Sequence, residues 1–343
     1  MAYSNILETI GKTPLVRLHK TVADIPARVY AKLESFNPGL SAKDRIALHI
    51  IERAEQLGLL REGGTVVDAT SGNTGFSLAM VCAWKGYRCV LTVTDKISKD
   101  KLSGLRAMGA EVVLCPKDAL PDDPNSYVRR AEQLAREIPG AFYANQNFNP
   151  DNADAHYLST GPEIWEETNG QVTWLIGSAS TGGTLCGTGR YLREQNPQMK
   201  IIAVDAYGSV LKKYHETGIY DPSEIGSSRI EGTGKNFIPG NVDFEIIDRF
   251  IKVTDKDSAL RTRELARKEG ILAGYSSGAV LQCLREIKDQ LSASDTVVLL
   301  FADHGSKYVS KVFDDDWMRA QGFPVEEEGE PLSTFSSCFP AKP

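Results

Sequence analysis

The sequence predicts an α/β protein made of two doubly wound lobes with parallel-rich sheets. From residue 44 onward, short β-branched segments alternate with helical patterns. Such alternation is typical of parallel sheets with helices on both faces. The alternation occurs as two series, one before residue 116 and one after residue 170. The length of 343 residues allows each series its own hydrophobic core.

The first series begins with an amphipathic helical pattern over residues 45–58, which ends at Gly58. Strand and helix then alternate. The pattern predicts strands at 65–70, 88–94 and 111–115, and helices at 74–86 and 98–109. Gly86 closes the first of these two helices, and Ser98 is a good N-cap for the second.

The second series follows the same rhythm with one interruption. The pattern predicts strands at 171–179, 200–206 and 295–303, and helices at 182–195, 257–270 and 277–290. Residues 207–244 are rich in glycine, serine and charge, and they are too long for an ordinary connection. We expect this segment to be a functional loop or a cover over the cleft.

We expect a smaller, mobile α/β lobe at residues 44–150. Residues 1–43 plus 151–323 would form a larger α/β lobe, with a cleft between the two. Residues 324–343 contain prolines and acidic residues with little periodicity, so we expect a disordered tail there.

Composition excludes several classes of protein. The net charge of −6 argues against a nucleic-acid partner. No apolar run approaches the roughly 20 residues of a membrane helix, and the N-terminal residues lack the pattern of a signal peptide. The expected location is therefore the cytoplasm.

The cysteines do not predict a metal site or a disulfide framework. No two form a C-x-x-C pair, and none clusters with histidine. We expect buried thiols in a reducing compartment and no bound metal. The six are Cys82, Cys89, Cys115, Cys186, Cys283 and Cys338.

Lys43 is the first candidate for chemistry. The turn-forming residues 37–42 deliver it one residue before a helical pattern starts. The partial positive charge of a helix N-terminus disfavours an ammonium group, which would help keep Lys43 a nucleophilic amine. Taken alone, the pattern is more often that of a surface lysine.

Two loops between a strand and a helix are candidate anion sites. Residues 70–75, Thr-Ser-Gly-Asn-Thr-Gly, combine hydroxyls, an amide and glycine N–H groups that suit a carboxylate. Residues 180–184, Ser-Thr-Gly-Gly-Thr, can hold a phosphate. The second loop lacks both the Walker A lysine and the G-x-G-x-x-G pattern of dinucleotide sites. Plain helix-start turns are the alternative in both places.

The combination of the three features is informative. A carboxylate loop, a phosphate loop and a poised lysine fit an amino acid joined to a phosphorylated aldehyde. Pyridoxal 5'-phosphate is that aldehyde, and it supplies an electron sink. The sequence therefore predicts an enzyme that uses this cofactor.

A rival hypothesis comes from residues 274–278, Gly-Tyr-Ser-Ser-Gly. They match the G-x-S-x-G nucleophile elbow of serine hydrolases, and Asp303 and His304 follow in the hydrolase chain order. The elbow needs a strand that runs into Ser276, and the preceding segment is short for that. A hydrolase would also leave Lys43 and both loops unexplained.

Six motifs together resemble the fold type II pyridoxal-phosphate enzymes, the group of cysteine synthase and cystathionine β-synthase. The resemblance covers about residues 4–323 and implies a fold like that of the tryptophan synthase β subunit. The motifs are residues 11–18, 37–45, 70–75, 180–184, 231–239 and 274–278.

The resemblance implies roles for individual residues. Lys43 would form the Schiff base and later move protons at Cα. Asn73 would bond the cofactor's ring oxygen, and Ser276 would face its pyridine nitrogen. In the larger lobe, the phosphate would lie on Ser180, Thr181, Gly182, Gly183 and Thr184. In the smaller lobe, the substrate carboxylate would lie on Thr70, Ser71, Gly72, Thr74 and Gln146.

The resemblance also implies a reaction. A hydroxyl at Ser276 cannot keep the pyridine nitrogen protonated, which favours β-elimination to an aminoacrylate intermediate. Serine, O-acetylserine or cysteine would lose its β-substituent, and a thiol would then add. The implied assembly is a homodimer.

Within the group, the chain is closer to cystathionine β-synthase, which joins serine or cysteine to homocysteine and can release hydrogen sulfide from cysteine. The stretch 205–211 and Glu231, a candidate substrate contact, are typical of that branch. Cysteine synthase, acting on O-acetylserine and sulfide, is the alternative. Ser180 replaces a usual glycine. Lys235 replaces a usual tyrosine, and it either binds a second carboxylate or is solvated.

Overall fold

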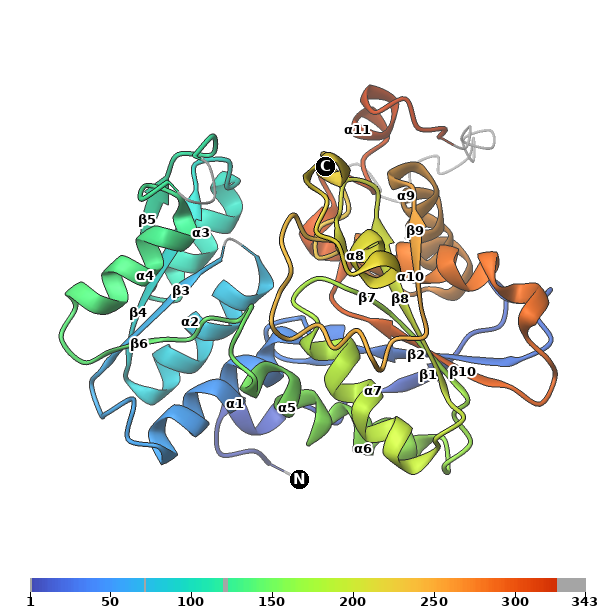
Figure 1. Cartoon of the computed structure of the whole chain (residues 1–343), viewed down its shortest axis with the longest axis horizontal. Coiled ribbons are helices and arrows are strands. Elements are labelled where there is room, and N and C mark those ends of the chain that lie inside the picture. Colours follow the sequence, from blue (N-terminus) through green and yellow to red (C-terminus); the bar gives the residue numbers. More distant parts are fainter. Residues whose placement is uncertain (1, 71, 120–122, 326–343) are drawn as a thin grey trace, which may run out of the picture.

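A computed structural model describes residues 2–70, 72–119 and 123–325 of the chain. Ser71, Cys338 and most of the predicted tail at 324–343 lie outside these residues. Figure 1 shows two sheets side by side, each covered by helices. Both sheets are mainly parallel, so the predicted α/β class is confirmed.

The larger sheet has six strands in the order β1-β2-β10-β7-β8-β9. All neighbouring pairs are parallel except β1 with β2. The strands are β1 (Leu15–Arg17), β2 (Arg28–Leu33), β7 (Trp174–Ser178), β8 (Lys200–Ala206), β9 (Arg249–Val253) and β10 (Thr296–Phe301).

The smaller sheet has four parallel strands in the order β5-β4-β3-β6. They are β3 (Thr65–Ala69), β4 (Arg88–Thr94), β5 (Glu111–Cys115) and β6 (Ala141–Tyr143). Each strand predicted from the sequence is present in one of the two sheets. The predicted boundaries of the lobes, at residues 43/44 and 150/151, stay a prediction.

Helices lie on both faces of each sheet because successive strand residues point to opposite faces. Those of the four-stranded sheet are α2 (Asn73–Lys85), α3 (Lys99–Ala107) and α4 (Tyr127–Glu137). Helix α1 (Lys43–Gln56) packs against α2, and α5 (Asp151–Tyr157) packs against both α1 and α7. Those of the six-stranded sheet are α6 (Thr160–Glu167), α7 (Gly183–Gln195), α8 (Leu211–Thr217), α9 (Asp255–Glu264) and α10 (Tyr275–Glu286). α11 (Asp315–Ala320) follows near the end of the described chain.

The predicted helix ends follow from local chemistry. Gly86 lies directly after α2 and Gly58 two residues after the end of α1, and they adopt positive φ, at 77° and 68°. Ser98 caps α3 by accepting a hydrogen bond from the Lys101 N–H. The predicted helix at 257–270 instead begins at Asp255, and its last turn, Leu265–Glu269, is a π-helix. The segment 207–244 is largely irregular but contains α8 and a 3₁₀ turn at Pro222–Glu224.

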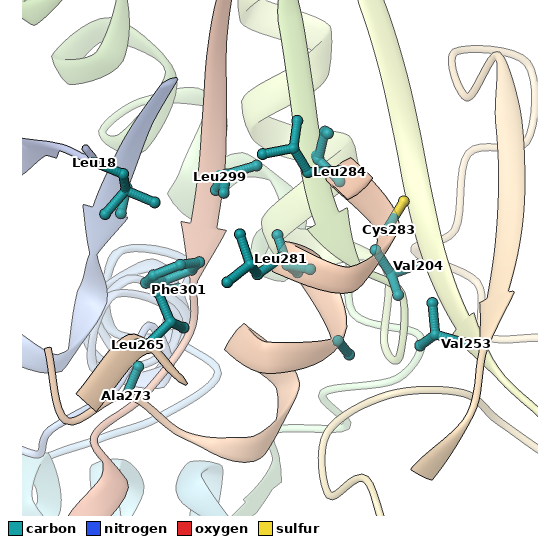
Figure 2. Close-up of a cluster of buried hydrophobic side chains, with 14 of the residues drawn as sticks. Leu18, Val204, Val253, Leu265, Ala273, Leu281, Cys283, Leu284, Leu299 and Phe301 are labelled. Carbon is teal, nitrogen blue, oxygen red and sulfur yellow. The ribbon is translucent and has the colours of Figure 1, made fainter. Parts of the chain in front are cut away.

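The main core lies between α10 and the six-stranded sheet. Figure 2 shows Leu281 and Leu284 of α10 beside Leu299 and Phe301 of β10, with Val204 of β8 nearby. These five side chains are all buried. This packing fixes the direction of α10, and hence the place of its first turn.

A buried network of charges anchors the first turn of α1. The Arg45 guanidinium donates to both carboxylate oxygens of Glu34, at 2.7 and 2.9 Å, and to both of Glu163, at 2.7 and 2.8 Å. Lys32 adds a third buried charge, 2.9 Å from Glu163. Burial alone would raise the pKa of Glu34, but the neighbouring Arg45 holds it below its usual value.

We expect Arg45→Met to lower the free energy of unfolding by about 3–5 kcal/mol, because Glu34 would be left as a buried charge without its main partner. Urea unfolding at pH 7 measures this loss. The matched control, Arg53→Met at an exposed position of α1, should change stability by less than about 0.5 kcal/mol. Equal effects of the two substitutions would contradict the anchoring role.

Candidate active site

A cavity of about 420 Å³ opens between the two sheets. It lies at the carboxyl ends of parallel strands, where α/β proteins bind ligands. Thr70 follows β3, Ser180 follows β7 and Asp303 follows β10, and all three line the cavity. The fold therefore brings both predicted anion loops to one place.

Most of the predicted site residues share this cavity. Gly183 lies behind its wall, and the structure does not describe Ser71. The predicted residues that line the cavity are Lys43, Thr70, Gly72, Asn73, Thr74, Gln146, Ser180, Thr181, Gly182, Thr184, Glu231, Lys235 and Ser276.

Lys43 is the first residue of α1 and lines the cavity. Removal from water lowers its pKa to about 8, although the charges of Asp303 and Glu34 act in the opposite direction. From the sequence, the positive end of the helix was expected to lower the pKa of Lys43. Burial is the larger cause in the folded protein.

The loop at 70–75 is tied to the residues that follow β6. The Thr74 hydroxyl donates to Gln146 Oε1 at 2.6 Å. The Gly72 N–H donates to the Thr70 hydroxyl at 3.3 Å, and α2 begins at the next residue. The first N–H groups of this helix therefore lie at the cavity, where a carboxylate can accept from them.

In the loop at 180–184, glycine is required at residues 182 and 183. Gly182 has φ of +93°, and a Cβ atom there would lie 2.4 Å from the Asn241 carbonyl oxygen. A Cβ atom at Gly183 would lie 1.9 Å from Asn152 Oδ1. The backbone can approach a ligand closely for this reason. Ser180 is not among the residues with positive φ, so its side chain is compatible with the loop.

This loop is a good fit for a phosphate group. It leads into α7, a helix of 13 residues, whose first N–H groups carry partial positive charge. Thr181 Oγ accepts a hydrogen bond from Asn152 at 3.2 Å, and Thr184 Oγ lies 3.1 Å from His156 Nε2. Both threonine hydroxyls are thereby oriented from behind the loop.

The side-chain amide of Asn73 is held in one orientation. Its Oδ1 accepts from Lys307 at 2.6 Å, and its Nδ2 donates to Asp303 Oδ2 at 2.8 Å. A lysine only donates and a carboxylate only accepts, so a flipped amide would lose both bonds. Tyr308 also donates to Asp303, at 2.7 Å. One hydrogen of the Asn73 amide is left for a ligand.

Glu231 lines the cavity, but its carboxylate is already engaged. One oxygen accepts from Lys101 of α3 at 2.6 Å, and the other accepts from Lys311, beyond β10. Burial alone would raise the pKa of Glu231, but Lys101 and Lys311 together hold it below its usual value. Glu231 thus joins a helix of the four-stranded sheet to the chain that follows the six-stranded sheet.

Lys235 lines the same cavity with a different environment. Its Nζ lies 5.1 Å from the centroid of the Phe237 ring. Burial, helped by the charge of Lys43, lowers its pKa to about 8, and Asp68 acts in the opposite direction. Asp68 is buried at the end of β3, where burial raises its pKa to about 7.

Sequence reasoning did not assign Asp68, Lys101 or Lys307. Asp303 was noted only for the hydrolase hypothesis. The available indication was position, since Asp68, Asp303 and Lys307 all lie at or just beyond the carboxyl end of a strand. Their partners are distant in sequence, which conceals the contacts.

Ser276 is buried in the first turn of α10 and lines the cavity. The residues before it form only an isolated bridge, Ala273 with His304, and no strand runs into Ser276. The His304 ring is 2.8 Å from the Ser306 hydroxyl. The geometry that a hydrolase nucleophile elbow requires is therefore missing here.

Within residues 2–70, 72–119 and 123–325, no helix is long and apolar enough to cross a membrane, and no three His, Cys, Asp or Glu side chains group as metal ligands. Cys82, Cys89, Cys115, Cys186 and Cys283 are buried and unpaired.

The chain matches known proteins over most of its length. Residues 6–303 match the family model described as pyridoxal-phosphate dependent enzyme. Cystathionine beta-synthase of Apis mellifera is 40% identical over 93% of this chain, and the match spans 63% of that protein, less than two thirds of its length. Cysteine synthase of Staphylococcus aureus is 39% identical over 89% of this chain and 95% of its own.

Two solved structures are similar in fold and sequence. An O-acetylserine dependent cystathionine beta-synthase from Helicobacter pylori gives a TM-score of 0.82 at 33% identity, covering 91% of this chain and 98% of its own. A hydrogen sulfide-producing enzyme from Fusobacterium nucleatum gives a TM-score of 0.81 at 34% identity. The match covers 90% of this chain and 100% of that enzyme's chain.

We expect Gly182→Ala to destabilise the protein by about 2–5 kcal/mol, because it combines left-handed strain of about 1–2 kcal/mol with overpacking of about 1–3 kcal/mol. Chemical denaturation measures the change. Gly218→Ala is the control, since Gly218 also has positive φ but its Cβ would meet nothing within 4 Å. If both variants lost the same stability, the close contact with Asn241 would not constrain the loop.

Proposed function

Because the chain belongs to the family of pyridoxal-phosphate dependent enzymes, we propose that it catalyses β-replacement on a small amino acid. A donor amino acid loses its β-substituent, and a thiol takes its place. One observation carries the proposal: Lys43, the glycine loop at 180–184 and the carboxylate loop at 70–75 meet in one cavity.

The residues present fit the cofactor. The backbone at Gly182 and Gly183, which no Cβ can occupy, would hold the phosphate together with Ser180, Thr181 and Thr184. Asn73 would donate its free amide hydrogen to the ring oxygen, and Ser276 would bond the pyridine nitrogen. Bound pyridoxal phosphate supplies the electron sink that stabilises negative charge at the donor's Cα.

Lys43 would have two tasks. With a pKa of about 8, about a tenth of its side chains are neutral at pH 7, compared with about three in ten thousand at the ordinary value. The neutral amine can bond covalently to the cofactor's aldehyde carbon. In its second task, Lys43 would remove the proton from the donor's Cα and later return one.

The donor's carboxylate would be bound at the start of α2. Thr70, Gly72, Thr74 and Gln146 line this end of the cavity, and we assign Ser71 to the same group. The hydrogen bond between Thr74 and Gln146 preorganises the loop. We propose that the lobe of residues 44–150 moves to enclose the donor and exclude water, while the lobe of residues 1–43 and 151–323 holds the phosphate.

For substrates, we propose the cystathionine β-synthase type, with serine or cysteine as donor and homocysteine as acceptor. Cysteine as donor would release hydrogen sulfide, and a similar structure is of a hydrogen sulfide-producing enzyme. Cysteine synthesis from O-acetylserine and sulfide is the second candidate, favoured by the full-length similarity to cysteine synthase.

We further propose a cytoplasmic homodimer. The five buried, unpaired cysteines of the described chain suit a reducing compartment. The dimer rests on the family resemblance, and gel filtration with light scattering tests it.

Lys43→Ala should lower turnover by at least about 10²–10⁴-fold, because the variant lacks the amine that moves the Cα proton. The folded state should persist. Borohydride reduction of the wild-type protein loaded with pyridoxal phosphate should leave a phosphopyridoxyl group on the peptide that contains Lys43. Label on another lysine, or full turnover by the variant, would refute the assignment. Lys99→Ala, at an exposed position of α3, is the control.

A further inference from the structure

We propose that Lys235 binds the carboxylate of the acceptor substrate, so that the second substrate is an amino-acid thiol and not sulfide alone. This inference rests on the proposed β-replacement and selects among its acceptors. The lysines that line the cavity differ in whether protein groups already bind their ammonium groups.

Four lysines of the described chain line the cavity, and two of them are engaged by protein groups. The Lys101 ammonium is 2.6 Å from Glu231. The Lys307 ammonium donates to Asn73 at 2.6 Å and to the Gly39 carbonyl at 3.1 Å. Lys43 is reserved for the cofactor. Among the described residues, Lys235 is thus the one remaining cation of this cavity that is available to a substrate.

The Lys235 ammonium has neither a hydrogen bond nor an ion pair with the residues that the structure describes, and its close contact is with the face of the Phe237 ring. A partly desolvated cation without an acceptor is costly for the protein alone. A bound carboxylate would remove that cost, so the arrangement favours an anionic ligand.

Asp68 opposes the loss of this charge but does not pair with the ammonium. Its buried carboxylate is near enough to attract Lys235 but forms no ion pair with it. Asp68 Oδ2 has no hydrogen-bond partner among the described residues. The attraction opposes the effects of burial and of Lys43, while the ammonium stays open to the cavity.

The backbone of Lys235 is fixed from the side of the six-stranded sheet. Its N–H donates to the Ser209 hydroxyl at 3.0 Å, and its carbonyl accepts from Val210 at 2.9 Å. The preceding Gly234 donates to the Ala179 carbonyl at 2.7 Å. The backbone at Lys235 is thus anchored to the six-stranded side of the cavity, whereas the donor loop at 70–75 follows a strand of the four-stranded sheet.

Two separate carboxylate positions in one cavity suit a reaction between two amino acids. The donor's carboxylate would occupy the start of α2, and the acceptor's would occupy Lys235, with the thiol directed to the donor's Cβ. Sulfide has no carboxylate and cannot form this charge-assisted hydrogen bond between a carboxylate and Lys235. A charge-assisted hydrogen bond of this kind raises affinity by about 10- to 100-fold.

The test uses the full chain loaded with pyridoxal phosphate, Lys235→Met, and Lys235→Arg as the charge-preserving control. Acceptors are homocysteine and its analogue without the carboxylate, 3-mercaptopropylamine, together with sulfide. In Lys235→Met, the KM for homocysteine should rise about 10- to 100-fold, several times more than the KM for sulfide. Lys235→Arg should recover part of the homocysteine affinity. Equal changes for all acceptors, or none for homocysteine, would overturn the inference.

Two further measurements separate the possible failures. Release of the donor's leaving group without any acceptor tests β-replacement chemistry alone. If the wild-type protein releases it but Lys235→Met shows no acceptor selectivity, the inference fails and the proposed function stands. If Lys235→Met does not fold, the wild-type protein decides: it should favour homocysteine over 3-mercaptopropylamine by at least about tenfold, and equal use of both would refute a carboxylate site.

Discussion

The buried charges around Arg45 hold the first turn of α1, and the place of Lys43 depends on them. Arg45 is bonded to Glu34, directly after β2, and to Glu163 of α6. The neighbouring Asp44 accepts from the Gly39 N–H and from the Ser77 hydroxyl of α2. Lys43 therefore faces the cavity, while Asp44 is bonded to a helix of the four-stranded sheet and Arg45 to the six-stranded side. An amine fixed in this way needs no reorganisation before it reacts.

The cavity owes its chemistry to desolvated positive charge. Burial is the main reason that Lys43 and Lys235 have lowered pKa values, and Lys43 also repels Lys235. The same field attracts a phosphate and carboxylates, which are the anionic groups of the cofactor and of amino-acid substrates. Asp303 moderates this field, and it also holds the Asn73 amide together with Lys307. Electrostatics and orientation are thus provided by the same side chains.

Features contained in one continuous segment were predictable from the sequence. Buried strands such as 88–94, and the loops at 70–75 and 180–184, carry their whole pattern within a few residues. Strands β1, β2, β6 and β9 were not predicted. β1 and β6 have only three residues, too few to show periodicity, but β2 and β9 are longer, and α4 was missed although its pattern is strongly amphipathic. Lys307 could not be assigned, since its partner Asn73 lies 234 positions away. Glu231 was expected to contact substrate, but Lys101 and Lys311 reach it from distant elements.

The irregular segment 207–244 connects the parts of the site that must act together. Glu231 binds Lys101 of α3, and Lys235 enters the cavity four residues later. Asn241 lies against Gly182 of the phosphate loop, and its side chain donates to the Gln146 carbonyl at 3.0 Å. A single stretch therefore contacts α3 of the four-stranded sheet, the Gln146 backbone after β6 and the loop at 180–184, and it also places Lys235 in the cavity. A regular helix could not do this, because its side chains would point outward from one axis. The lack of regular structure is what allows the segment to bring these groups to one cavity.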